Sequence, residues 1–391
     1  MLMSKEDNVT SIEQWDELDI SVDLLRGIYA YGFEKPSPIQ KKAVYPFLAK
    51  TDLIAQAQSG TGKTGCFTIG ALSIIDITNH AVQVLLLAPT RELASQTKNV
   101  LDTIGVFMKG LRTQLLVGGT PTESCIRSLR DHTPHIVVGC AGRIYDMLQR
   151  KALDAKTLQL IVLDEADEML SHGFKEQVYN IFQFMPNEVQ VALFSATLPN
   201  EIHTLTDKFM RNPVKVLVNK EALTLEGISQ YYVAIDNDQH KIECLKDLFG
   251  SFSISQCIIY CNSIQRVQDV YNALLEDNFP VGQIHSGMEK EERNDSFNNF
   301  KKGVTRVLIS SNVTARGIDV QQVSTVINFD LPQCVHSYLH RIGRSGRWGR
   351  KGVGINFVTR RDQVQLKSIE QHYSTEIVKM PDNWNDGIGT S

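Results

Sequence analysis

The feature that most constrains the fold is an alternation, along the whole chain, of short apolar runs with longer stretches of helical character. This alternation is typical of parallel sheets, because each parallel connection must cross the sheet and usually does so through a helix. Strands buried on both faces are continuously apolar. The predicted strands are Leu53–Ala57, Val84–Ala88, Thr113–Val117, Ile136–Val138, Leu160–Leu163 and Val191–Phe194, then Gln256–Tyr260, Val281–Ile284, Arg306–Ile309, Thr325–Phe329 and Gly354–Val358. Two such series predict two α/β domains, each a parallel sheet with helices on both faces.

The length of 391 residues also suits two domains, since a single hydrophobic core stops growing at about 250–300 residues. A charged stretch over residues 219–227 follows the apolar Val214–Val218 and predicts a short hinge. The expected divisions are an N-terminal segment over 1–40, a first domain over 41–218, the linker over 219–227 and a second domain over 228–391.

The charge balance argues against a protein that binds nucleic acid through overall attraction. The formal net charge is −4 and the pI about 6.2, whereas domains of that kind usually have a pI above about 9. We expect any nucleic acid to be held by a local track of residues. No stretch approaches the ~20 apolar residues of a membrane helix, and the start MLMSKEDNVT predicts no secretory signal, so we expect no membrane association. Seven cysteines without a CxxC pair indicate a reducing compartment, the cytosol or the nucleus.

A phosphate-binding loop is predicted at Ala57-Gln58-Ser59-Gly60-Thr61-Gly62-Lys63-Thr64, between a strand and a helix start. Small residues there let backbone N–H groups surround phosphate oxygens, and the helix N-terminus adds partial positive charge. We expect Lys63 to reach the β- and γ-phosphates and the Thr64 hydroxyl to help hold Mg²⁺. The strict pattern begins with glycine, and Ala57 is acceptable there if its φ is negative. The alternative is a glycine-rich connector without function.

An acidic motif, Asp164-Glu165-Ala166-Asp167, follows the apolar run Leu160–Leu163. It is therefore expected at the carboxyl end of a buried strand, where open α/β sheets place their ligands. A carboxylate at Asp164 can hold Mg²⁺, mostly through water, and Glu165 can polarise an attacking water. Alone the pairing is weak, but with the phosphate loop it predicts a nucleoside triphosphatase.

A third motif, His340-Arg341-Ile342-Gly343-Arg344-Ser345-Gly346-Arg347, lies near the far end of the chain. Spacing of three places its arginines near one helical face, if the segment is helical. Arginine is planar, always charged and bidentate toward phosphate, so the second domain can supply charge to the first. The alternative is a solvated basic face.

With these motifs the chain resembles the DEAD-box ATP-dependent RNA helicases over nearly its whole length. The segment Gly32–Gln40 is similar to the adenine-reading motif of that family. By this resemblance Phe33 stacks on adenine, Gln40 hydrogen-bonds the edge of the base, and Trp15 stands where an upstream aromatic residue supports Gln40. Without the motif, Phe33 and Trp15 would be interpreted as core aromatics. The resemblance implies two tandem RecA-like domains, with ATP and Mg²⁺ as cofactors.

The same resemblance assigns roles in the nucleotide site. It implies that Arg344 and Arg347 meet the γ-phosphate, that His340 contacts the acidic motif, that Asp319 binds the ribose and that Arg316 helps couple the domains. The expected catalytic residues are Lys63, Asp164, Glu165, His340, Arg344 and Arg347. The expected nucleotide-binding residues are Phe33, Gln40, Ala57, Gln58, Ser59, Gly60, Thr61, Gly62, Lys63, Thr64 and Asp319, and the expected metal ligands are Thr64 and Asp164. Ser195-Ala196-Thr197 matches a motif that would connect the acidic motif to the RNA side.

The resemblance further implies an RNA track that contacts phosphates without reading sequence, which suits backbone amides and arginine. The 2′-hydroxyls would supply the preference for RNA over DNA. The expected RNA-binding residues are Pro89, Thr90, Arg91, Gly118, Gly119, Gly142, Arg143, Arg293 and Ser311.

Three places depart from the family pattern. Cys140-Ala141 replaces Thr-Pro, Ser311-Asn312 replaces Thr-Asp, and Lys290 stands where glutamine is expected. The lost threonine hydroxyl could cap a helix, an interaction that contributes about 0.5–2 kcal/mol. The nucleotide motifs are intact, so we expect these changes to bear on RNA affinity and coupling.

Within the family, the segments Leu223–Gly227, Gly317–Val323 and Gly346–Gly352 resemble the subgroup that includes eukaryotic translation initiation factor four-A. Three functions compete: an ATP-dependent RNA helicase that unwinds short duplexes in translation initiation, an ATP-gated RNA clamp of an exon-junction or ribosome-assembly type, and a phosphate-loop ATPase acting on something other than nucleic acid. We expect RNA and protein partners, a monomer, and a cytoplasmic or alternatively nuclear location.

Overall fold

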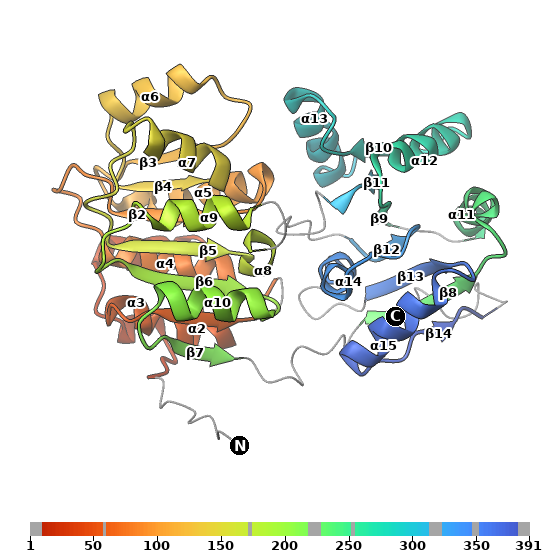
Figure 1. The fold of residues 1–391 in the computed structure, drawn as a ribbon, viewed down its shortest axis with the longest axis horizontal. Coiled ribbons are helices and arrows are strands. Elements are labelled where there is room, and N and C mark those ends of the chain that lie inside the picture. The colour runs from red at the N-terminus through yellow and green to blue at the C-terminus, as the bar shows by residue number, and fades with distance from the viewer. Residues whose placement is uncertain are drawn as a thin grey trace. The chain divides into compact units, whose positions relative to one another are not determined.

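The computed structural model describes residues 10–57, 60–170, 174–217, 228–251, 255–312, 323–345 and 352–381. The chain divides into two compact units, Met1–Asn219 and Lys220–Ser391 (Figure 1). Within the described residues each unit is built on a seven-stranded parallel sheet, and no helix there is long and apolar enough to span a membrane. The expected fold class, two α/β units with parallel sheets, is confirmed. The predicted linker over 219–227 lies outside the described residues.

The first unit alternates strands and helices. Its strands are β1 (Leu53–Gln56), β2 (Val84–Leu87), β3 (Thr113–Leu116), β4 (Ile136–Gly139), β5 (Leu160–Asp164), β6 (Gln190–Ser195) and β7 (Val214–Leu217). Its helices are α1 (Val22–Ala30), α2 (Pro38–Ala43), α3 (Tyr45–Leu48), α4 (Lys63–Ile74), α5 (Arg91–Ile104), α6 (Thr122–Asp131), α7 (Ala141–Gln149), α8 (Ala166–Met169), α9 (Lys175–Phe182) and α10 (Asn200–Phe209), with 3₁₀ turns η1 (Trp15–Glu17) and η2 (Gly105–Phe107). The strand order is β3-β4-β2-β5-β6-β1-β7.

Both faces of the first sheet are buried, which explains the continuous apolar runs. Successive strand residues point to opposite faces. In β1, Leu53 and Ala55 join a core that includes residues of α1, α4 and α5. Ile54 joins a second core that includes residues of α6, α7, α9 and α10. The sheet is therefore the middle layer of three (Figure 1), and its functional side chains can only stand at the strand ends.

The second unit follows the same plan. Its strands are β8 (Ile228–Ala234), β9 (Cys257–Tyr260), β10 (Val281–Ile284), β11 (Val307–Ser310), β12 (Thr325–Asn328), β13 (Gly352–Val358) and β14 (Val378–Lys379). Its helices are α11 (Lys241–Ser251), α12 (Ile264–Glu276), α13 (Lys290–Lys301), α14 (Val335–Ile342) and α15 (Gln363–Tyr373), with the 3₁₀ turn η4 (Asp238–His240). The strand order is β10-β11-β9-β12-β13-β8-β14. Counted from the first strand of its own unit, each sheet has the same order, as expected for tandem domains of one fold.

Three strands are absent from the sequence prediction. β7 and β14 lie at sheet edges, where one side of the strand lacks a neighbour and the residues are largely exposed. β8 includes Ser229 and Gln230 and is mostly half-buried or exposed. A search for continuously apolar runs finds central strands and misses strands of this kind.

Candidate functional site

The carboxyl ends of the parallel strands meet along one edge of the first sheet, which is where sheets of this type place ligands. The phosphate loop, the acidic motif and Ser195–Thr197 follow β1, β5 and β6, which are neighbours in the sheet. Pro89–Arg91, Gly118–Gly119 and Gly142–Arg143 follow or flank the ends of β2, β3 and β4, which are also neighbours. The edge therefore divides into one half with the predicted nucleotide motifs and another with the predicted RNA motifs.

The phosphate loop leads from β1 into α4, which begins at Lys63. Gly60 has φ 84° and Gly62, the N-cap of α4, has φ 98°, a backbone region that favours glycine. Ala57 is fully buried and is not among the residues with positive φ, so alanine fits the first position of the motif. Its N–H donates to the Ser195 carbonyl at 3.0 Å and ties the loop to β6. Gln58 and Ser59 lie outside the described residues.

Lys63 is a buried cation beside a buried carboxylate. Its Nζ lies 3.6 Å from Glu165 Oε1, and the two side chains are 5% and 3% exposed. Within the described part of the chain the Lys63 ammonium donates no hydrogen bond. Since a buried polar group normally has hydrogen-bond partners, these N–H donors fit an anionic ligand such as phosphate.

The acidic motif forms a tight turn from β5 into α8. Asp164 ends the strand, and its Oδ1 accepts a hydrogen bond from the Glu165 N–H at 2.9 Å. Glu165 has φ 48° and ψ 54°, the left-handed region, although it is not glycine. Such a conformation costs of order 1–3 kcal/mol and is concentrated at functional sites. The strain is a structural sign of function that the sequence could not give.

The Ser195–Thr197 segment holds the last carboxylate of the acidic motif. The Thr197 hydroxyl donates to Asp167 Oδ2 at 2.6 Å, and the Asp167 N–H donates to Ser195 Oγ at 3.3 Å. Gln56 Nε2 donates to the Ala196 carbonyl at 3.2 Å. The ends of β1, β5 and β6 are thus linked by direct hydrogen bonds, so a change at one motif reaches the others.

The charges at this edge fit a divalent cation. Asp164, Glu165 and Asp167 are all buried, and Lys63 forms an ion pair with Glu165. Burial, followed by the nearby Glu165 charge, raises the pKa of Asp164 to about 7. Carboxylate and hydroxyl oxygens are the ligands that Mg²⁺ prefers, and the half-buried Thr64 lies in the first turn of α4. The donor set of Asp164 and Thr64 therefore fits Mg²⁺.

The predicted adenine motif packs on the start of α4. Gln40 Oε1 accepts from the Ser37 N–H at 2.8 Å, and Gln40 Nε2 donates to the Gly62 carbonyl at 3.1 Å. A side-chain amide has two N–H groups and two oxygen lone pairs, so each end of Gln40 keeps one further hydrogen bond for a base. A Cβ atom at Gly65 would lie 2.6 Å from the Phe33 ring, so glycine is needed for this packing.

Phe33 stands on an aromatic support. Its half-buried ring stacks on the fully buried Trp15 ring, with the two centroids 6.4 Å apart and the planes inclined by 28°. The centroid of the Tyr31 ring lies 4.7 Å from that of Phe33. Trp15 therefore supports Phe33 by direct ring contact. It is also a core residue, as the alternative interpretation of this aromatic held.

In the other half of the edge, Arg91 brings two predicted RNA motifs together. Thr90 Oγ1 accepts from the Leu93 N–H at 3.3 Å and caps α5, which begins at Arg91. A Cβ atom would lie 3.1 Å from the Arg91 guanidinium at Gly118 and 2.8 Å from it at Gly119. The guanidinium can lie this close to the backbone because both residues are glycine.

Cys140 shows the consequence of the lost threonine. It is the N-cap of α7, with an extended backbone, and its side chain makes no capping hydrogen bond. Arg143 in the first turn donates from Nη2 to the Thr120 carbonyl at 2.8 Å and from Nη1 to Cys125 Sγ at 3.1 Å. The Arg143 side chain thus connects α7 to the segment that follows β3. Gly142 is exposed beside it.

In the second unit, the condition for a shared helical face of the arginines is not met, because the helix ends within the motif. α14 ends at Ile342, with Gly343 as its C-cap, so Arg344 lies beyond the helix. Arg344 is 2% exposed, and its Nε donates back to the His340 carbonyl at 3.1 Å. His340 is buried in the last turn. Glycine disfavours helix continuation, and the spacing of the arginines carries no information about where the helix ends.

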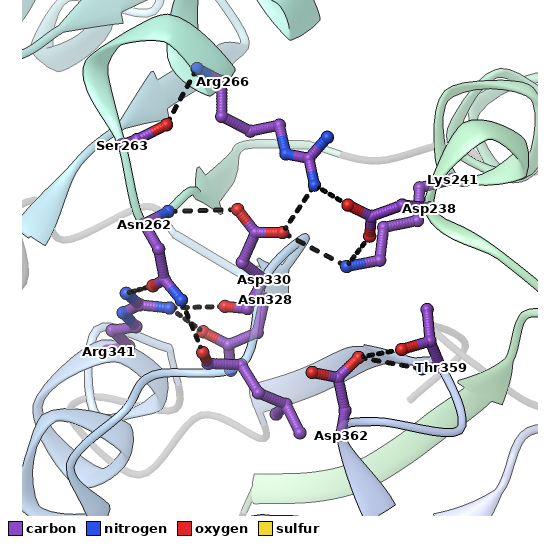
Figure 2. A network of polar contacts seen from close by, with 11 residues as sticks. Asp238, Lys241, Asn262, Ser263, Arg266, Asn328, Asp330, Arg341, Thr359 and Asp362 are labelled. Carbon is purple, nitrogen blue, oxygen red and sulfur yellow. Dashed lines mark hydrogen bonds and ion pairs between the residues drawn. The ribbon is translucent and has the colours of Figure 1, made fainter.

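A polar network that the sequence prediction missed lies at the ends of β9 and β12 (Figure 2). Asp330 accepts from Lys241 at 3.1 Å and from the Asn262 N–H at 3.1 Å, and lies 3.5 Å from Arg266. Lys241 and Arg266 both pair with Asp238 as well. Asn262 and Asp330 each follow an apolar strand closely, the same signal that identifies Asp164.

The other predicted site residues of the second unit that the structure describes come from different elements. Arg293 lies in the first turn of α13, and its N–H donates to the Glu289 carbonyl at 3.0 Å. Ser311 follows β11, and its N–H donates to the Ile284 carbonyl at 3.2 Å. Arg316, Asp319 and Arg347 lie outside the described residues, as does the side chain of Lys290.

Both units match the profiles of known protein families. The DEAD/DEAH box helicase profile matches residues 37–205, and the helicase conserved C-terminal domain profile matches residues 240–349. Eukaryotic initiation factor 4A of Caenorhabditis elegans is 48% identical over 377 residues, 96% of this chain and 93% of the relative. ATP-dependent RNA helicase eIF4A of Coccidioides immitis (strain RS) is 49% identical over 385 residues, 98% of this chain and 96% of the relative.

A solved structure is similar over the same extent. Dbp5 of S. cerevisiae, bound to RNA and ADP BeF3, has a TM-score of 0.87 and 32% identity. The match covers 96% of this chain and 97% of that one.

Proposed function

The chain belongs to the DEAD/DEAH box helicase family and is an ATP-dependent RNA helicase, and we propose that it locally separates short RNA duplexes in translation initiation. The observation that carries this proposal is that the predicted nucleotide motifs and the predicted RNA motifs lie on neighbouring halves of one sheet edge. Its relatives named as initiation factor 4A and eIF4A support the pathway. The RNA-bound yeast relative supports RNA as the substrate.

In the nucleotide half, we assign adenine recognition to Phe33 and Gln40, because an aromatic face and an amide with spare donor and acceptor suit a base. Lys63 and the phosphate loop bind the phosphates. Thr64 and Asp164 hold Mg²⁺, which when bound compensates phosphate charge. Glu165 orients and polarises the attacking water.

The second unit completes the site in this proposal. Arg344 and Arg347 stabilise the charge that develops on the γ-phosphate, and Asp319 binds the ribose. ATP and RNA each bind residues of both units, so together they favour a closed arrangement that neither stabilises well alone, which is a positive coupling of sites. A closed arrangement that bends the bound strand is incompatible with a regular duplex, and short helices separate locally.

RNA contact is assigned to Pro89–Arg91, Gly118–Gly119 and Gly142–Arg143 in the first unit and to Arg293 and Ser311 in the second. Backbone amides and arginines hold phosphates without reading sequence. We propose that the chain acts as a monomer with protein partners and in the cytoplasm. The seven cysteines are free thiols, which suits a reducing compartment.

The first test of this function is the steady-state ATPase rate of the unmodified chain, with and without single-stranded RNA. We expect RNA to raise the rate, because RNA and ATP favour the same closed arrangement. Single-stranded DNA is the control and should stimulate far less, since it lacks 2′-hydroxyls. A flat response to RNA with ATP binding intact would contradict the helicase cycle and favour the ATP-gated clamp.

Glu165→Gln tests the residue assigned to the attacking water. The amide keeps the size of the side chain and removes the carboxylate, so ATP and RNA should still bind while hydrolysis falls by about 10²-fold or more. Single-turnover hydrolysis measured beside equilibrium ATP binding separates the two effects. Exposed Glu188→Gln is the matched control. Normal hydrolysis by Glu165→Gln would remove this assignment.

A further inference from the structure

Arg341 is fully buried, and each N–H donor of its guanidinium has a hydrogen-bond acceptor inside the second unit. Nε donates to Asn312 Oδ1 at 2.9 Å, and Nη2 donates to Asn312 Oδ1 at 2.6 Å and to Asn262 Oδ1 at 2.7 Å. Nη1 donates to Asn328 Oδ1 at 3.2 Å and to the Asp330 carbonyl at 2.7 Å. These bonds match the five N–H donors of an arginine. We call Asn262, Asn312 and Asn328 the asparagine cage.

The orientation of two amides in the cage is fixed by their other partners. Asn262 Nδ2 donates to the Leu331 carbonyl at 2.8 Å, and Asn328 Nδ2 donates to Asn356 Oδ1 at 2.8 Å. Each amide must therefore present its oxygen to Arg341. The Asn356 amide in turn donates to the Tyr338 hydroxyl at 3.2 Å, so the chain of hydrogen bonds returns to α14. The side of α14 that bears Arg341 is held to the sheet by this network.

The hydrogen-bond acceptors of Arg341 are neutral oxygens, since the nearby Asp330 carboxylate bonds Lys241 and the Asn262 N–H. Burial accordingly lowers the pKa of the Arg341 guanidinium to about 10. The Tyr260 ring, with its centroid 5.2 Å from the guanidinium carbon, adds a cation–π contact. Arg341 is thus positioned by hydrogen bonds to neutral oxygens and not by an ion pair, and the oxygens of the asparagine cage fix where its guanidinium lies.

Asn312 differs from the other members of the cage in its chain neighbour. Like Asn262 it is exposed, but it directly follows Ser311, the residue after β11. Asn262 follows β9 and Asn328 ends β12, and β9 pairs with both β11 and β12, so the three asparagines stand at the ends of neighbouring strands. Asn312 is therefore the cage member that links Ser311 to Arg341 most directly, through two hydrogen bonds.

Arg341 in turn is adjacent to His340, whose carbonyl accepts the Arg344 Nε hydrogen bond. We propose that Asn312 is a positioning residue: it transmits RNA contact at Ser311 through Arg341 to the end of α14, which carries His340 and Arg344. The proposal rests on the proposed function, because Ser311 is assigned to RNA and Arg344 to the γ-phosphate there. It gives the neutral Asn312, which stands where the family has an acid, a role in coupling.

The test compares three variants of the full chain by ATPase assay over a range of RNA concentrations. Asn312→Ala removes the acceptor, and because the position is exposed, water can reach the two donors, so folding should persist. Asn312→Asp keeps the acceptor and adds charge. Asn272→Ala, at an exposed asparagine on α12, is the matched control.

For Asn312→Ala we expect the RNA-stimulated kcat to fall about tenfold, the loss expected for hydrogen bonds to a charged donor, with the RNA-independent rate unchanged. Asn312→Asp should keep the stimulation of the unmodified chain, since charge-assisted bonds are at least as strong. Asn272→Ala should behave as the unmodified chain.

Full stimulation of Asn312→Ala would overturn the proposal. So would an equal fall of both rates together with a lower melting temperature, because that is the mark of a structural residue only. If the unmodified chain itself shows no stimulation by RNA, the proposed function fails, which is a separate result from failure of the Asn312 assignment.

Discussion

Replacing Lys63 with alanine is expected to abolish ATP turnover, with a fall of at least about 10³-fold. The ammonium is 5% exposed and donates no hydrogen bond within the described residues, so its donors are available for the phosphates. Removing a charge that stabilises a phosphoryl transition state in a buried site has effects of this order. Equilibrium ATP binding and phosphate release measure the ground-state and chemical parts of the loss.

The same substitution also changes the folded state. Glu165 loses an ammonium 3.6 Å from its Oε1, and removing one partner of a buried pair commonly costs about 3–5 kcal/mol. A melting curve therefore accompanies the assay, and activity is compared well below the transition. Lys42→Ala, at an exposed lysine of α2, is the matched control. ATP turnover by Lys63→Ala at the rate of that control would refute the assignment.

The parts of the site that could be predicted from sequence are those built from one segment. The phosphate loop is a strand, a small-residue turn and a helix start within a dozen positions, and Asp164 directly follows its strand. Central strands are apolar throughout because both faces are buried. The edge strand β14 is exposed and lacks this signal, and β7, although mostly apolar, is largely half-buried or exposed.

What could not be predicted is assembled from distant segments. The acceptors of Arg341 come from three asparagines and one carbonyl located between Asn262 and Asp330, and no spacing rule brings them together. The left-handed backbone of Glu165 is equally invisible, since any residue type can be held there by its surroundings. The end of α14 at Ile342, by contrast, could be predicted from the sequence, because Gly343 follows it directly.

Arg344 lies just beyond the end of α14 at Ile342. Replacing it with alanine is expected to lower ATP hydrolysis by about 10³-fold and to leave ATP binding unchanged. An arginine finger supplies of order 10³–10⁵ in rate in other phosphoryl-transfer enzymes. Arg344 lies just beyond α14 with its Nε on the His340 carbonyl, so the backbone of the helix end fixes the direction of its guanidinium. The residues assigned to adenine, the phosphate loop and Mg²⁺ belong to the first unit, and Arg344 is assigned to charge that develops only in the transition state, so the affinity for ATP should change little.

Arg344→Lys distinguishes charge from shape. Lysine keeps the positive charge but not the planar, bidentate fork, so we expect it to recover only a small part of the rate. Arg361→Ala, at an exposed arginine of the same unit, is the matched control. Single-turnover hydrolysis and equilibrium ATP binding decide the outcome: full hydrolysis by Arg344→Ala would remove the finger assignment. Parallel loss of ATP binding would instead make Arg344 a ground-state contact, because a transition-state residue lowers the rate without lowering affinity.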